Sequence, residues 1–220
     1  AVNVDNPGNP IPTGYLKLPD QAYDVVVGDT HIAVANGNKG VQIIGNDPYN
    51  PEVIAKLETL TDAKGVAIDG SSVYVADGNS GLDILAITDT QKISVAGHYP
   101  TNGYALNVAI LGNYAYIVTA PGQLDIAKID NPKEPATIKP AEPITNILSN
   151  SKDIRFFDQS QYSSLAFVAD GVNGLKVLDI AKPLTPFKVA EWKTEDILED
   201  VWFDEHFAFL ADGTSGIEVL

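Results

Sequence analysis

The sequence predicts an all-β fold, a five-bladed β-propeller, because one structural unit is copied five times along it. Three copies are nearly identical: ADGNSGLDIL from Ala76, ADGVNGLKVL from Ala169 and ADGTSGIEVL from Ala211. Two weaker copies begin at Ala35 (ANGNKGVQII) and Val118 (VTAPGQLDIA). A unit of this kind cannot bury its apolar side alone, so neighbouring copies are expected to stack.

The spacing of the copies gives the size of the unit. The apolar residues after the turn glycine are Val41, Leu82, Leu124, Leu175 and Ile217, so the successive steps are 41, 42, 51 and 42 residues. The first unit contains four short apolar or alternating runs, at 23–27, 31–35, 41–44 and 52–60, bounded by Gly, Asn, Asp and Pro. Runs of this length joined by Asn-Gly and Asp-Gly steps are typical of strands connected by hairpins. Four strands per unit of this length predict a propeller blade.

We expect the N-terminal segment to complete the last blade. The last unit stops in mid-repeat at Leu220, and residues 1–22 resemble its missing second half. Joining Leu220 to Ala1 gives a step of 44 residues from Ile217 to Val41, close to the other steps. The predicted domain is residues 1–220, with blades at about 23–60, 61–103, 104–151, 152–197, and 198–220 plus 1–22. The alternative is a piece of a longer array.

The third step is longer than its neighbours because of two inserted stretches. One lies within 157–164 (FDQSQYSS) and the other within 141–153. Repeat proteins often carry insertions on their binding face, and a tolerated surface insertion is the alternative.

The composition excludes several classes of function. The chain has no cysteine, which excludes disulfides, thiolate metal sites and a cysteine nucleophile. Its net charge is −15, with 29 acidic against 14 basic residues, which argues against nucleic acid and anionic membranes as partners. No apolar run approaches the roughly 18 residues that suggest a membrane span. The lack of both cysteine and methionine favours an extracytoplasmic or hot environment, because nothing in the chain is easily oxidised.

An acidic ring is the strongest candidate site. The first strand of each blade begins at an aligned position, occupied by Asp24, Gly65, Asn107, Asp153 and Asp200. Because this strand lines the central channel of a propeller, three carboxylates and an amide are expected to converge near the axis. Oxygen ligands of this type suit hard cations such as calcium. The sequence therefore predicts a candidate metal site at Asp24, Asn107, Asp153 and Asp200. The alternative is that these side chains bond backbone amides where their strands begin.

The aspartates of the DG turns carry no comparable signal. Asp77, Asp170 and Asp212 lack the alternating acids and closing glutamate of a calcium loop, so we expect ordinary turn residues. Serine, histidine and aspartate show no arrangement typical of a hydrolytic triad, and no catalytic residue is predicted.

Aromatic residues recur on two first strands. Trp202 and Phe203 lie in the last blade, and Phe156 and Phe157 occupy the matching place in the fourth. They would suit stacking on a sugar or a partner, and filling the core between blades is the alternative.

The fourth copy, LAFVADGVNGLKVLDIAKPLTPFKVAEW at residues 165–192, resembles the LVIVD repeat of bacterial and archaeal surface proteins. The resemblance extends over nearly the whole chain. The second copy departs from it at the paired prolines, and the third at the turn. The resemblance implies a β-propeller with a surface location, and it supplies no catalytic residues.

Two classes of function follow. We expect a non-catalytic, secreted or cell-surface propeller that binds other surface or extracellular proteins in adhesion or as a structural or filament component. Self-association by strand exchange would occur if the N-terminal segment paired with a neighbour's last blade. The alternative is a metal-dependent enzyme, or a binder of glycans or small molecules, at the channel mouth. No cofactor is expected for the first class, and calcium is the ion the ring would suit.

Overall fold

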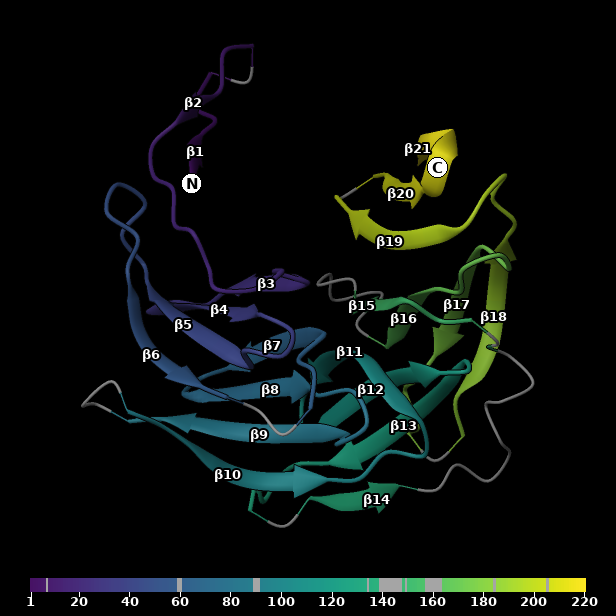
Figure 1. The fold of residues 1–220 in the computed structure, drawn as a ribbon. Coiled ribbons are helices and arrows are strands. Elements are labelled where there is room, and N and C mark those ends of the chain that lie inside the picture. The colour runs from purple at the N-terminus through teal and green to yellow at the C-terminus, as the bar shows by residue number, and fades with distance from the viewer. Residues whose placement is uncertain are drawn as a thin grey trace.

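The computed structural model describes residues 1–6, 8–58, 61–88, 92–133, 135–138, 148, 150–156, 164–183, 185–204 and 206–220. Within these ranges the strands form five sheets of three or four strands around a common axis, plus one separate hairpin (Figure 1). The predicted five-bladed propeller is confirmed. Among the described residues, no helix is long and apolar enough to cross a membrane.

The blades follow the chain in order, and neighbouring strands within each blade are antiparallel. Blade 1 contains β3 (Asp24–Val27), β4 (His31–Ala35), β5 (Val41–Gly45) and β6 (Val53–Leu57). Blade 2 contains β7 (Gly65–Asp69), β8 (Ser72–Ala76), β9 (Leu82–Ile87) and β10 (Ile93–Tyr99). Blade 3 contains β11 (Tyr104–Leu111), β12 (Tyr114–Ala120), β13 (Gln123–Lys128) and β14 (Ala136–Ile138).

Blade 4 contains β15 (Asp153–Phe156), β16 (Leu165–Ala169), β17 (Leu175–Asp179) and β18 (Phe187–Trp192). Blade 5 contains β19 (Leu198–Phe203), β20 (Ala208–Asp212), a 3₁₀ turn η2 (Gly213–Ser215) and β21 (Gly216–Val219). The first strand of each blade lies innermost, and the later strands lie progressively outward (Figure 1).

The hydrophobic core lies between consecutive blades. Val41 and Ile43 of blade 1 pack with Val66 and Val73 of blade 2. The same contact recurs between blades 2 and 3, 3 and 4, and 4 and 5. Blades 2, 3 and 4 therefore bury one apolar face against the blade before and the other against the blade after, as expected for stacked repeats, while blades 1 and 5 each pack on one neighbour.

The aspartate of the DG turn anchors the loop that leads into its own blade. The Asp77 carboxylate is buried and accepts hydrogen bonds from the backbone N–H groups of Thr61 (3.1 Å) and Asp62 (2.8 Å). Asp212 likewise accepts from the backbone N–H groups of Glu195 and Asp196, both at 3.0 Å. These buried carboxylates accept from partly buried backbone N–H groups, which goes beyond the turn role predicted from sequence.

The glycine after this aspartate connects successive blades. Gly78 has a φ of +53°, a region that favours glycine, and its backbone pairs with Ala105 of blade 3. Gly37 pairs in the same way with Ala63 of blade 2. The Asp-Gly pair thus makes two contacts. The aspartate carboxylate bonds the loop that leads into its own blade, and the glycine backbone pairs with the next blade.

The predicted closure by the N-terminal strand is wrong in this structure. Blade 5 has three strands among the described residues, and β1 (Val2–Asn3) pairs with β2 (Ile11–Pro12) in a hairpin of its own. The hairpin and β21 lie on opposite sides of an open arc (Figure 1). A local turn explains the difference, because Asn6 accepts from the N–H groups of Gly8 (3.2 Å) and Asn9 (2.9 Å). Asn and Gly favour such turns, and pairing across a short loop costs less conformational entropy than pairing with the far end of the chain.

The interpretation of the two inserted stretches falls mainly on residues 139–147, 149 and 157–163. These lie outside the described residues.

Candidate functional site

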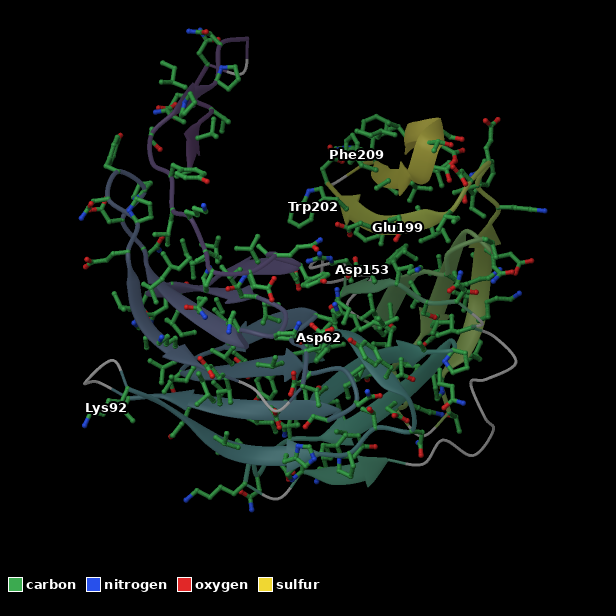
Figure 2. The ribbon with its side chains drawn as sticks, viewed as in Figure 1. Asp62, Lys92, Asp153, Glu199, Trp202 and Phe209 are labelled. Carbon is green, nitrogen blue, oxygen red and sulfur yellow. The ribbon has the colours of Figure 1, made fainter. Side chains whose placement is uncertain are left out.

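The predicted ring residues converge, as expected, on one axial cavity of about 310 Å³. It is lined by residues at the starts of the first strands: Tyr23, Asp24, Lys64, Leu106, Asn107, Lys152, Asp153, Arg155, Glu199 and Asp200. Figure 2 marks Asp153 and Glu199 on the neighbouring first strands of blades 4 and 5. The cavity therefore combines carboxylates with three cationic side chains.

Asp153 is the most buried acid of the ring, with 3% of its surface exposed. One of its carboxylate oxygens accepts a hydrogen bond from the Asn107 amide, and the other accepts from Arg155 Nε at 2.9 Å. The Arg155 guanidinium also lies 3.7 Å from Asp200 Oδ1. Burial and the nearby Asp200 raise the pKa of Asp153 to about 8, and Arg155 opposes this rise.

Two other ring residues bond backbone amides at the strand starts, which was the alternative expectation. Asp24 accepts from the N–H of Val25 at 2.8 Å and from the N–H of Val66 in blade 2 at 2.9 Å. Asp200 accepts from the N–H of Val201 at 2.7 Å. Asp24 therefore connects blades 1 and 2, while the contacts of Asp153 connect blade 4 to blade 3.

Blade 2 has glycine in the ring because its neighbour leaves no room for a side chain. A Cβ on Gly65 would lie 2.7 Å from the Cα of Asn107 and 2.9 Å from the carbonyl oxygen of Leu106. Real Cβ atoms do not approach a backbone so closely, so the ring carries four side chains and one close backbone contact.

The described residues hold no group of three or more His, Cys, Asp or Glu side chains placed to bind a metal ion. Arg155 lies between Asp153 and Asp200, where it supplies the positive charge that a cation would supply. Sequence reasoning missed this arginine, although the signal was present. Side chains two residues apart lie on the same side of a strand, so Arg155 necessarily follows Asp153 there.

The aromatic residues of the first strands divide between two roles. Phe203 packs on Phe167 with ring centroids 4.3 Å apart, and Phe156 packs on Tyr116 at 5.2 Å, as core filling predicts. Trp202 instead is 65% exposed at the open side of blade 5 (Figure 2). Phe157 lies outside the described residues.

The array also has two uncovered apolar faces, one at each end, which the sequence reasoning did not foresee as sites. Val25 of blade 1 is 58% exposed. The matching residues of the other blades are buried to between 1% and 4% exposure: Val66, Val108, Ile154 and Val201. We call Ala22, Val25 and Val27 the blade 1 end face. It is the face that, in every other blade, packs on the preceding blade.

The other uncovered face belongs to β21. Ile217 is 74% exposed and Val219 is 51% exposed, and together they form the blade 5 end face. The residues that match Ile217 are at most 5% exposed: Val41, Leu82, Leu124 and Leu175. This face is of the kind that packs on the following blade elsewhere in the chain. Each end face therefore presents side chains that a neighbouring blade covers at the matching positions elsewhere in the chain.

Radial antiparallel sheets around an axial cavity define the protein as a β-propeller, and comparison with known families makes the class more specific. The LVIVD repeat model matches residues 61–101, 102–139 and 162–194, together just over half of the chain. The chain belongs to the LVIVD repeat family. No curated protein matches it.

Solved structures share the fold at low sequence identity. A functionally unknown protein from Desulfotomaculum acetoxidans DSM 771 has a TM-score of 0.73 at 15% identity, over 90% of this chain and 64% of that chain. The WD40 β-propeller domain of Doa1 has a TM-score of 0.66 at 10% identity, over 94% of this chain and 67% of that chain. The computationally designed Ika8 protein has a TM-score of 0.65 at 11% identity, over 89% of this chain and 56% of that chain. The chain thus spans between about half and two thirds of these larger proteins.

Proposed function

We propose that this propeller is a secreted or cell-surface protein that works by binding other proteins and not by catalysis. The observation that carries the proposal is that the chain belongs to the LVIVD repeat family and presents exposed apolar side chains on blades 1 and 5. Val25, Ile217 and Val219 are exposed where the other blades bury the matching side chains. Exposed apolar patches bordered by polar residues mark protein interaction sites.

The axial cavity supports a structural role for the ring. Asp24, Asn107 and Arg155 each make a contact that crosses from one blade to the next. The polar groups of the ring thus stabilise the arrangement of the blades. The net charge of −15 favours solubility. Binding to partners would use the exposed apolar side chains instead.

A site-specific photo-crosslinking experiment tests the interaction. A benzophenone amino acid is placed at Ile217 or, as the matched control, at Val95, an equally apolar side chain that is 56% exposed on the outer strand β10. On intact source cells we expect position 217 to capture a protein that position 95 does not. Equal capture at both positions, or none, would reject the end face as an interaction site.

Protease treatment of the same intact cells tests the location. We expect an added protease to remove the chain while a cytoplasmic marker survives. A chain that persists until the cells are lysed would contradict the surface assignment.

The alternative function is a metal-dependent enzyme or a small-molecule or glycan binder at the channel mouth. Its support is the raised pKa of Asp153 inside a cavity, because perturbed carboxyls gather at functional sites. Calorimetric titration with calcium distinguishes the two. Binding at one ion per chain that is lost in Asp153→Asn would favour the alternative.

A further inference from the structure

We propose that the axial cavity binds a free α-amino acid with an apolar side chain. The ligand carboxylate would accept hydrogen bonds from Arg155, its ammonium would donate to Asp200 and Glu199, and its side chain would enter an adjoining apolar channel. This site goes beyond the proposed function, because no residue of the blade 1 or blade 5 end face lines it. A site for a small molecule and a surface for proteins can therefore be tested separately.

Two cavities adjoin along the axis and differ in polarity. The first is the polar cavity of about 310 Å³ described above. The second has a volume of about 350 Å³ and is walled by residues of β3, β7, β11 and β15. Arg155 and Asn107 line both cavities. Both volumes lie in the range of small-ligand pockets, so one molecule could place a polar group in the first and an apolar group in the second. The apolar wall of the second includes Val26, Ala67, Ile68, Ala109, Ile110 and Phe156.

Arg155 lies where the two cavities meet, and it is the only arginine of the chain. The other thirteen basic residues are lysines. Among the described residues, its one hydrogen bond runs from Nε to Asp153, while Nη2 lies 3.7 Å from Asp200 Oδ1, beyond hydrogen-bond distance. The two Nη groups are therefore available to a ligand. A guanidinium offers a planar pair of donors that matches a carboxylate, which a lysine ammonium does not.

The mouth of the cavity carries charges of both signs in near balance. Burial raises the pKa of Asp153 to about 8, so at neutral pH this carboxyl is mostly protonated. Three ionised carboxyls then face three cations. A balance of this kind favours a ligand that carries both charges over a simple anion or cation. The ionised carboxyls are Asp24, Glu199 and Asp200, and the cations are Lys64, Lys152 and Arg155.

Some of these charges already have partners, and the freer carboxylates belong to blade 5. The two oxygens of Asp24 each accept a backbone N–H, and Lys64 pairs with Asp62 at 2.9 Å. The Asp200 side chain is 56% exposed, and Glu199 is exposed as well. A ligand ammonium would therefore find its acceptors on blade 5, beside the guanidinium of blade 4.

The spacing of the available charges favours an α-amino acid. Nη2 of Arg155 and Oδ1 of Asp200 are 3.7 Å apart. In an α-amino acid the carboxylate and the ammonium are bonded to the same carbon, so both can reach partners that lie this close together. In an ω-amino acid several rotatable bonds separate the two groups, and holding them together costs conformational entropy.

Small side chains keep the channel open beside Arg155. The position two residues after the ring is Ala67 in blade 2 and Ala109 in blade 3. Both side chains are partly exposed and line the channel. A ligand side chain that enters leaves water for an apolar wall, which favours leucine or phenylalanine over polar amino acids.

Isothermal titration calorimetry of the whole chain with L-leucine tests the site. We expect one leucine to bind per chain. The matched control is ε-aminocaproic acid, an isomer of leucine that carries the same two charged groups at opposite ends. It should bind about tenfold more weakly or worse, because only one charged group can be paired at a time. Isocaproic acid, which lacks the ammonium, and isoamylamine, which lacks the carboxylate, should be weakened by a similar factor.

Two variants connect the binding to named residues. Arg155→Gln should weaken leucine binding by about tenfold or more. Lys92→Gln removes the same charge far from the axis and should leave binding unchanged (Figure 2). Ala109→Leu fills part of the channel, so it should weaken the binding of leucine more than that of alanine. Circular dichroism and Tm establish that each variant is folded before it is titrated, and Ala109→Leu serves alone if Arg155→Gln does not fold.

Three results would overturn the proposal: no heat from leucine or phenylalanine at millimolar concentration, equal binding of leucine and its isomer, or leucine binding that survives both variants in the folded state. Photo-crosslinking at position 217 tests the proposed function separately, because Ile217 lines neither cavity. Capture at position 217 without leucine binding would keep the proposed function and reject the amino-acid site. Leucine binding without capture would do the opposite.

Discussion

The uncovered end faces predict that one repeat position has two different energetic roles. Leu82 and Ile217 occupy the same place after the turn glycine, but Leu82 is fully buried and Ile217 is 74% exposed. Truncation of a buried leucine to alanine costs about 2–5 kcal/mol, since packing is lost and a cavity remains. Truncation of an exposed side chain stays within about 0.5 kcal/mol. In dilute solution, Leu82→Ala is therefore expected to destabilise the chain several-fold more than Ile217→Ala.

Urea unfolding at low protein concentration measures both variants. For a chain of this size, 1 kcal/mol shifts Tm by about 2–4 °C, so thermal unfolding gives an independent reading. Equal costs for both variants in dilute solution would refute the reasoning, since Ile217 would then be covered within the single chain.

Three further predictions concern the inside of the array. Asp77→Ala leaves the N–H groups of Thr61 and Asp62 without an acceptor and should lower the free energy of unfolding in urea by about 2–5 kcal/mol. Asp77→Asn should lower it by less. If Asp77→Ala were less destabilising than Asp77→Asn, the anchoring role would be contradicted. Gly65→Ala places a Cβ 2.7 Å from backbone, so it should destabilise by about 2 kcal/mol or more; a neutral result in the same assay would show that the first strands of blades 2 and 3 separate freely. Asp153 has a pKa raised to about 8 in the folded chain, so the folded state holds a proton that the unfolded state releases. Stability should therefore fall as pH rises from about 4, near the pKa of an unfolded aspartate, to about 8, by at most about 1.4 kcal/mol per pH unit, and level off above that. Asp153→Asn should remove this dependence of stability on pH. An unchanged dependence would mean that another titrating group causes it.

The blades were predictable because their signals are local. Asn-Gly and Asp-Gly turns, period-two apolar runs and a constant spacing are all visible in sequence, and the structure places the strands of blade 1 at 24–27, 31–35, 41–45 and 53–57. Convergence of Asp24, Asn107, Asp153 and Asp200 followed from the repeat alignment, because equivalent positions at the starts of the innermost strands of a propeller lie close around its axis.

The closure was not predictable, because two competing pairings use the same residues. Residues 1–22 resemble the second half of a repeat, yet the turn at Asn6, Gly8 and Asn9 pairs Ile11 and Pro12 with Val2 and Asn3. The position of a segment within the repeat indicates which strand it could pair with. Only the structure shows which strand lies near it. The role of Arg155 does not follow from the ring position itself, because the arginine lies two residues after Asp153, on the same side of the strand, and the other blades have no arginine there.

Protease treatment of intact source cells tests the central claim of a surface-located propeller most directly. The account predicts that added protease removes the chain while a cytoplasmic marker survives. A chain that persists until the cells are lysed would contradict the account.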